Sequence, residues 1–165
     1  MPSSVSPARY SNLQIGLHWA IALLFTFNYF VSDGMGRALR VFSETGAIST
    51  LTARAHIIAG ITLLLLMVAR LVVRMRHGAP GVPAGHSGLT ELAATWGHRA
   101  LYLLLFALPV AGLVAWFGGV KIAGEAHEIM VNITLALIAG HISAALFHQF
   151  YLRDNLLQRM RPNKG

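Results

Sequence analysis

The chain has 165 residues, of which 55% are hydrophobic and only 12% are charged, and its formal net charge is +7. Soluble domains carry about a quarter charged residues, so this composition excludes an ordinary soluble domain and indicates a membrane protein. The chain has no cysteine, which excludes covalently attached c-type haem, iron–sulfur clusters and disulfides.

Four stretches are long and apolar enough to cross a bilayer, whose hydrocarbon core of about 30 Å requires roughly 20 mostly apolar helical residues. The predicted helices cover roughly residues 11–32, 52–75, 90–117 and 123–152. The first lacks the pattern of a cleavable signal peptide and is expected to be retained. In the third, Pro109 removes one backbone donor and is expected to kink the helix. The sequence therefore predicts an all-α fold, an integral membrane four-helix bundle formed by one domain over residues 1–165.

Positive charges are distributed unevenly over the segments that connect these helices. Nine of the 13 lysines and arginines lie in the N-terminal segment, the second connection with its flanks and the C-terminal tail. Because Lys and Arg are enriched on the cytoplasmic side of membranes, both termini are expected to face the cytoplasm. Such a basic rim also suits anionic lipid headgroups, so the pI near 10.9 does not require a nucleic-acid partner. The stretch at 76–88 is rich in Gly and Pro and is expected to be a polar linker.

Each predicted helix carries at least one histidine, although ionisable groups inside a membrane are costly and usually mark function. His127 and His141 are 14 residues apart on the last helix, so they share a face and lie about 21 Å apart along the axis. His56 lies near the outer end of the second helix, and His18 lies near the inner end of the first. This spacing predicts two pairs at different depths, His56 with His127 outside and His18 with His141 inside.

Two imidazoles that face each other in an apolar core lined by small residues are typical of a site that binds the iron of haem b. Two such centres at different depths would carry electrons across most of the bilayer. A single histidine in a membrane helix can instead be only a hydrogen-bond partner of a neighbouring helix, but four histidines at two matched depths favour haem. His148 shares the face of His141, and spacing alone leaves open which of the two pairs with His18.

Three stretches resemble the bacterial cytochrome b561 family, and in particular its short four-helix, superoxide oxidase type. These stretches are YSNLQIGLHW at 10–19, GHRALYLLLFALPVAGLV at 97–114 and HEIMVNITLALIAGHISAALFHQFYLRDNLLQRMRP at 127–162. The resemblance covers nearly the whole chain and implies two haem b groups. It implies that His18 and His141 are the axial ligands of the cytoplasmic-side haem iron and that His56 and His127 bind the periplasmic-side iron. It thus favours His141 over His148.

The resemblance also implies a function. In the superoxide oxidase branch, electrons pass from periplasmic superoxide through both haems to ubiquinone bound near the cytoplasmic side of the inner membrane. His98 and His148 lie toward that side and are candidates for the quinone site, because an imidazole can both donate a hydrogen bond and relay a proton. The alternatives are a hydrogen bond to a haem propionate for His98 and an interfacial position for His148.

The hypothesis that follows is a superoxide:ubiquinone oxidoreductase of the bacterial inner membrane, with lipid, quinone and superoxide as its partners. A second hypothesis is a haem b subunit that relays electrons between a partner dehydrogenase, hydrogenase or cytochrome and the quinone pool. A third is a haem-free or haem-handling membrane protein, such as a transporter whose histidines line a metal path. An anion-attracting outer face is not evident, because the outer connections and their flanks have no net charge: Arg37, Arg40, Arg54 and Lys121 against Asp33, Glu44, Glu125 and Glu128.

Overall fold

The computed structural model describes residues 9–78, 80, 88–154 and 156–162, and the regular structure within these residues is helical. Most of the linker expected at 76–88 lies outside the described residues. The helices are α1 (Asn12–Phe30), α2 (Met35–Thr45), α3 (Leu51–His77), α4 (Gly88–Gly118) and α5 (Lys121–Phe147), followed by the π-helical turn η1 (His148–Leu152) and the 3₁₀ turn η2 (Leu156–Met160). Helices α1, α3, α4 and α5 are long and apolar enough to cross a membrane. The predicted all-α membrane bundle is thereby confirmed.

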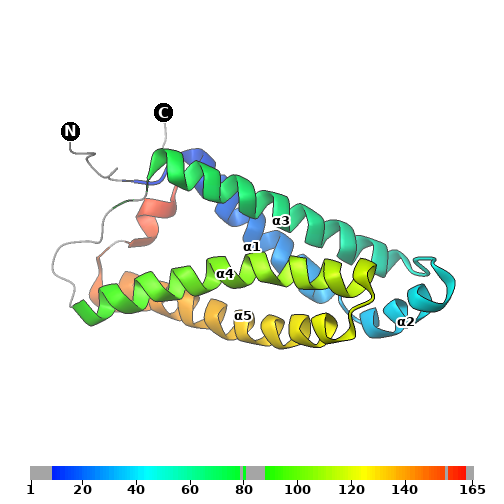
Figure 1. Ribbon diagram of the computed structural model, residues 1–165. Helices are drawn as coiled ribbons and strands as arrows, with labels where there is room; N and C mark the ends of the chain where they lie inside the picture. The colour runs from blue at the N-terminus through cyan, green and yellow to red at the C-terminus, as the bar shows by residue number, and fades with distance from the viewer. Residues whose placement is uncertain (1–8, 79, 81–87, 155, 163–165) are drawn as a thin grey trace.

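The long helices pack as a chain of neighbours: α1 against α3, α3 against α4, and α4 against α5 (Figure 1). Helix α2 lies at one end of this bundle, whereas α1 begins and η2 ends at the opposite end (Figure 1). Within the described residues, α5 does not pack closely along α1 or α3. The backbones of the helices that carry the histidine pairs therefore stay apart.

Capping side chains fix where α1 and α3 begin and how they meet. The Ser11 hydroxyl accepts a hydrogen bond from the backbone of Gln14 at 3.2 Å, and the Gln14 side chain accepts one from the backbone of Ser11 at 3.0 Å, which forms a capping box. Thr50 caps α3 in a similar way by accepting from Ala53 at 3.1 Å. The Gln14 amide also donates to the carbonyl of Gly78 at 2.9 Å. This last bond joins the start of α1 to the end of α3.

An apolar layer fills the middle of the bundle. Its buried members come from α1, α3 and α4: Ile21, Phe25, Leu63, Met67 and Leu108. Helix α5 adds Thr134, which lies halfway between His127 and His141 and is fully buried. The Thr134 hydroxyl donates to the carbonyl of Met130 at 2.7 Å, so its polar group is satisfied within its own helix. The two histidine levels are thus separated by a dry layer.

The outside of the bundle is covered by large apolar side chains. Leu23, Leu65 and Leu103 are 70%, 64% and 69% exposed, and they lie on three different helices. A soluble protein rarely exposes so continuous an apolar surface. Acyl chains of a bilayer suit it, because the backbone groups along the middle of each helix are bonded within the helix and need no water.

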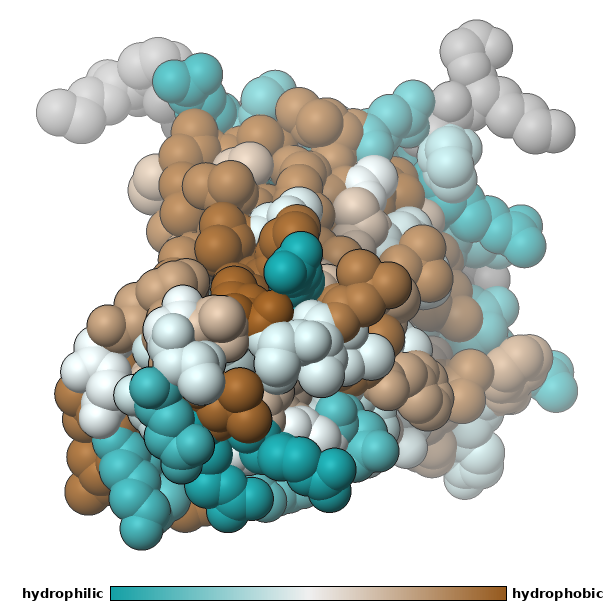
Figure 2. All heavy atoms as spheres, turned by 90° about the vertical axis from the view of Figure 1, so that its right-hand side faces the viewer, coloured by the Kyte–Doolittle hydropathy of each residue, from teal (hydrophilic) through white to brown (hydrophobic). Residues whose placement is uncertain are grey.

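Helix α2 was not predicted from the hydropathy of the sequence, because it lies outside the apolar spans. Its own signal is the recurrence of apolar residues at Met35, Ala38, Leu39 and Phe42, which is the spacing of an amphipathic helix. This face packs against the buried Trp116 of α4, and the ring centroids of Phe42 and Trp116 are 5.2 Å apart. Figure 2 looks onto this end of the molecule, where hydrophilic side chains gather beside apolar ones.

Candidate functional site

His56 of α3 and His127 of α5 face each other near the end that carries α2. Their ring centroids are 6.3 Å apart and their planes meet at 68°. The Nδ1 atom of His56 lies 3.2 Å from the carbonyl oxygen of Asn28, and that of His127 lies 2.8 Å from the carbonyl oxygen of Leu108. In the tautomer that donates both bonds, each Nε2 carries a lone pair. Histidines that bind metals are usually held in this way through their other nitrogen.

Gly112 of α4 makes room for the outer pair. A Cβ at this position would lie 3.2 Å from Nδ1 and 3.3 Å from Cε1 of His127, which is closer than an ordinary contact. The glycine therefore lets the imidazole reach the carbonyl of Leu108, one turn earlier on α4. The helix continues through the neighbouring Pro109.

His18 of α1 and His141 of α5 form the inner pair, with ring centroids 6.4 Å apart and planes at 64°. A third histidine joins them, because the ring of His98 on α4 lies 5.1 Å from that of His141 in an edge-to-face arrangement at 83°. The Nδ1 atom of His98 lies 2.6 Å from the carbonyl oxygen of Ala94. Trp19 packs edge-on against His18 at 5.3 Å. The structure thus brings three of the sequence-predicted histidines together at the inner level.

The separations within both pairs match the span of two imidazoles on one iron. A metal–imidazole bond is about 2.0–2.1 Å long and a ring nitrogen lies about 1.1 Å from the ring centre, so two rings on opposite sides of an iron have centroids roughly 6.3 Å apart. The observed distances are 6.3 and 6.4 Å. The 5.1 Å between His98 and His141 is too short for this arrangement. The donor sets of the two pairs therefore fit haem b, and the contact between His98 and His141 does not have this separation.

Two buried polar atoms at the outer level have no hydrogen-bond partner among the described residues, namely Oδ1 of Asn28 and Nε1 of Trp116. The Asn28 amide lies against Gly60, where a Cβ would be 3.7 Å from its Nδ2 atom. A buried polar group without a partner costs about 1–3 kcal/mol. A bound carboxylate, such as a haem propionate, would accept a hydrogen bond from Nε1 of Trp116, whereas Oδ1 of Asn28 requires a donor.

A positive charge lies beside the inner pair. Nε of Arg70 donates to the Tyr102 hydroxyl at 3.0 Å, and Nη1 donates to the carbonyl of Gln14 at 3.1 Å. Gln14 is one turn before His18 on α1. No acidic side chain pairs with Arg70 within the part of the chain that the structure describes. A half-buried guanidinium favours an anionic partner, and a haem propionate has that chemistry.

Two other contacts lie at this end. The Arg99 guanidinium packs over the ring of Trp96 at 5.0 Å. His148 turns toward the chain that follows it, with its Nδ1 atom 2.5 Å from Oδ2 of Asp154. The ring that faces His18 is that of His141.

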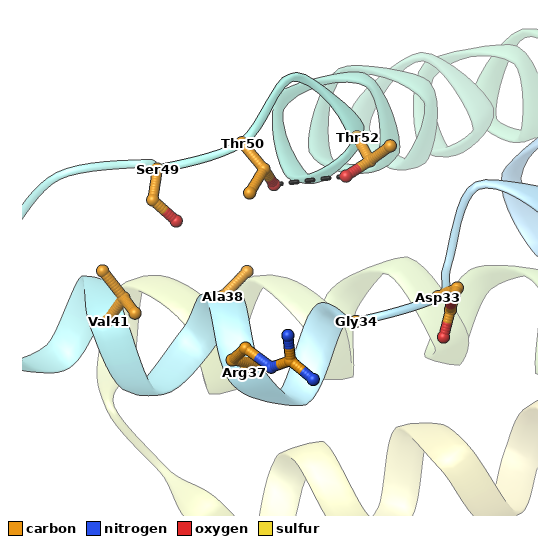
Figure 3. Close-up of a pocket in the computed structure, with 8 residues that line it drawn as sticks. All are labelled: Asp33, Gly34, Arg37, Ala38, Val41, Ser49, Thr50 and Thr52. Atoms are coloured by element: carbon orange, nitrogen blue, oxygen red, sulfur yellow. Dashed lines mark hydrogen bonds between the residues drawn. The ribbon is translucent and has the colours of Figure 1, made fainter.

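A pocket of about 130 Å³ lies at the outer end, between α2 and the start of α3 (Figure 3). Figure 3 shows hydroxyl residues on its α3 side, where the Thr52 hydroxyl donates to that of Thr50 at 3.2 Å. Charges of opposite sign, on Asp33 and Arg37, also line it. Neither histidine of the outer pair lines the pocket. Because a negative and a positive side chain both line it, the pocket has no excess of positive charge that would attract an anion. Its lining residues are Asp33, Gly34, Arg37, Ala38, Val41, Ser49, Thr50 and Thr52.

Comparison with known proteins identifies the fold and its general chemistry. Residues 9–163 match the family model described as prokaryotic cytochrome b561. The chain is 36% identical to cytochrome b562 of Cereibacter sphaeroides, over 93% of this chain and 96% of that protein. It is 30% identical to the probable superoxide oxidase CybB of Yersinia pestis (94% and 97% covered) and 31% identical to cytochrome b561 homolog 1 of Escherichia coli K12 (94% and 98% covered). These matches confirm the family resemblance: the chain belongs to the prokaryotic cytochrome b561 family of haem-binding membrane helical bundles that transfer electrons.

Proposed function

We propose that this chain is a di-haem b protein, one domain over residues 1–165, that transfers electrons from superoxide at the periplasmic face to ubiquinone near the cytoplasmic face. The observation that carries the proposal is the presence of two histidine pairs at different depths, each with the separation of two imidazoles on one iron. His18 and His141 would hold the cytoplasmic-side haem, and His56 and His127 the periplasmic-side haem. When bound, each haem supplies an iron that accepts and releases one electron.

The protein groups have separate tasks in this proposal. The carbonyls of Asn28 and Leu108 lie against Nδ1 of the outer imidazoles, which would leave their Nε2 atoms available to hold the haem iron. The apolar layer around Met67 keeps water and protons out of the space between the levels. Two superoxide ions release two electrons at the outer face and become two O₂, and one quinone takes up these electrons and two protons at the inner face. His98 and His148 are the candidates for contact with that quinone.

The proposed orientation places both termini in the cytoplasm of a bacterial cell. Helix α1 begins and η2 ends at the same end of the bundle (Figure 1), and most basic residues lie in the segments at that end. The positive-inside rule supports this direction. Helix α2 and the outer histidine pair then face the periplasm.

A relay subunit without a substrate of its own is the second candidate. It is favoured by the balanced charge of the outer end, where Asp33 and Arg37 line the same pocket and Lys121 pairs with Glu125 at 3.7 Å. Such a surface attracts superoxide no more than a neutral one. A redox protein that docks at this end would deliver electrons to the same histidine pair.

Transient kinetics of the purified protein test the proposal. Oxidised protein with two haems per chain is mixed with a pulse of superoxide, and haem absorbance is followed before and after addition of ubiquinone. Rapid haem reduction and then quinone-dependent reoxidation are expected. A reduction rate no faster than that of free haem, combined with normal reoxidation by ubiquinone, would support the relay subunit. A colourless preparation would exclude both functions.

A further inference from the structure

A histidine–aspartate dyad lies beyond the inner pair, at the end of α5. The Nδ1 atom of His148 and Oδ2 of Asp154 are 2.5 Å apart, and the two side chains are only 13% and 15% exposed. Hydrogen bonds to a carboxylate are short and strong, and this one is largely shielded from water. Neither residue is among the proposed haem ligands.

An irregular backbone turn brings His148 and Asp154 together. Helix α5 changes to the π-helical turn η1 at His148, and Arg153 then adopts a left-handed conformation with a φ of 54°. This turn brings the chain back, so that the N–H of Asp154 donates to the carbonyl of His148 at 3.3 Å. The Oδ1 atom of Asp154 accepts from the N–H of Leu156 at 3.2 Å. π-Helical turns and left-handed non-glycine residues are unfavourable, and they cluster at functional sites.

The dyad lies close to the inner electron-transfer site. His148 follows His141 by seven residues, which is about two turns or roughly 10 Å along a helix, with only about 20° of rotation between the two. Its neighbour Gln149 has a buried Oε1 atom with no partner among the described residues. The turn at the end of α5 therefore carries two polar groups about two helical turns beyond His141. These are the His148 imidazole, which Asp154 holds in place, and the amide oxygen of Gln149.

Quinone reduction requires protons as well as electrons. A carboxylate on Nδ1 orients an imidazole and balances the positive charge that forms when its Nε2 atom takes up a proton. Within the proposed function, on which this step rests, we infer that Asp154 positions His148 to deliver protons from the cytoplasmic side to the bound quinone. Two electrons arrive one at a time, two protons pass through His148, and two O–H bonds form on the quinone. Asp154 is a positioning residue.

The test compares two electron acceptors with the same reduced holoprotein in a stopped-flow experiment. A short-chain ubiquinone needs protons, whereas ferricyanide takes one electron and no proton. Asp154→Asn keeps one side-chain oxygen and removes the charge. We expect this variant to be reoxidised by ubiquinone at least about tenfold more slowly, since general acid catalysis typically contributes a hundredfold or more. Its reoxidation by ferricyanide, haem content and reduction by superoxide should equal those of the wild type.

Glu91→Gln is the matched control, because Glu91 is an exposed carboxylate in the first turn of α4, at the same end of the bundle. It should leave both rates unchanged. His148→Gln should likewise be reoxidised slowly by ubiquinone and at the wild-type rate by ferricyanide. If Asp154→Asn does not retain its haem, His148→Gln tests the inference in its place. A wild-type rate with ubiquinone in these variants overturns the inference, and so does an equal loss with both acceptors. A wild-type protein that ubiquinone cannot reoxidise overturns the proposed function instead, and the inference with it.

Discussion

The carbonyl oxygen of Leu108 lies 2.8 Å from Nδ1 of His127, so α4 orients an imidazole that α5 carries. The contact is possible because Gly112 has no side chain at the point where the ring passes α4. A helix that contributes no proposed ligand to the outer pair thus determines its geometry.

Gly112→Ala should displace His127 and weaken the outer site. The added Cβ would lie 3.2 Å from the ring, and overpacking of this kind typically costs about 1–3 kcal/mol. We expect loss of most of one haem per chain, measured by a pyridine haemochromogen assay. Gly36→Ala makes the same chemical change on α2, where a Cβ meets nothing within 4 Å, and should retain both haems. Full haem content in Gly112→Ala would show that the ring can move without losing the metal.

His56→Ala should remove the outer haem and leave the inner one, because the two pairs share no residue. The haem-to-protein ratio is expected to fall by about half, from two to one, and the remaining absorption bands should stay those of a low-spin b-type haem. A variant that loses both haems would show that the outer site supports the whole bundle rather than one iron.

His141 and His148 should differ in their effect on the inner haem. The ring of His141 faces His18, whereas His148 is bonded to Asp154. His141→Ala is therefore expected to lose one haem and His148→Ala to keep two, as judged by spectra of detergent-purified protein. The reverse result would assign the inner ligand to His148 and would contradict the proposed pairing.

Arg70→Gln should lower the midpoint potential of the inner haem. The guanidinium lies near His18 without an acidic partner among the described residues, and a nearby positive charge favours the reduced iron. A decrease of roughly 60 mV, equivalent to a tenfold change in a one-electron equilibrium, is expected in a redox titration followed by haem absorbance. Arg70→Lys should restore much of the potential, and Arg76→Gln, at an exposed position, should leave it unchanged.

Helical periodicity predicted which histidines share a face, but it left the partner of His18 open between His141 and His148, and only the family resemblance favoured His141. His127 and His141 had to share a face of α5 because they are 14 residues apart, and the depths of His18 and His56 followed from their places in the apolar spans. The contact between His98 and His141 could not be predicted in this way, because it depends on the rotation of α4 against α5. The dyad of His148 and Asp154 depends on a turn that leaves the α-helical repeat, and periodicity says nothing about residues beyond such a turn.

The apolar layer around Met67 and Thr134 has an electrical consequence. In the proposed function electrons tunnel through this layer from the outer level to the inner one, but the layer offers no path for protons, because its single buried hydroxyl among the described residues is bonded to its own helix. In the proposed orientation, each turnover would move negative charge inward and consume protons from the inner compartment. The reaction would therefore charge the membrane, and a resting voltage of 100 mV would oppose the transfer of each electron by up to about 2.3 kcal/mol.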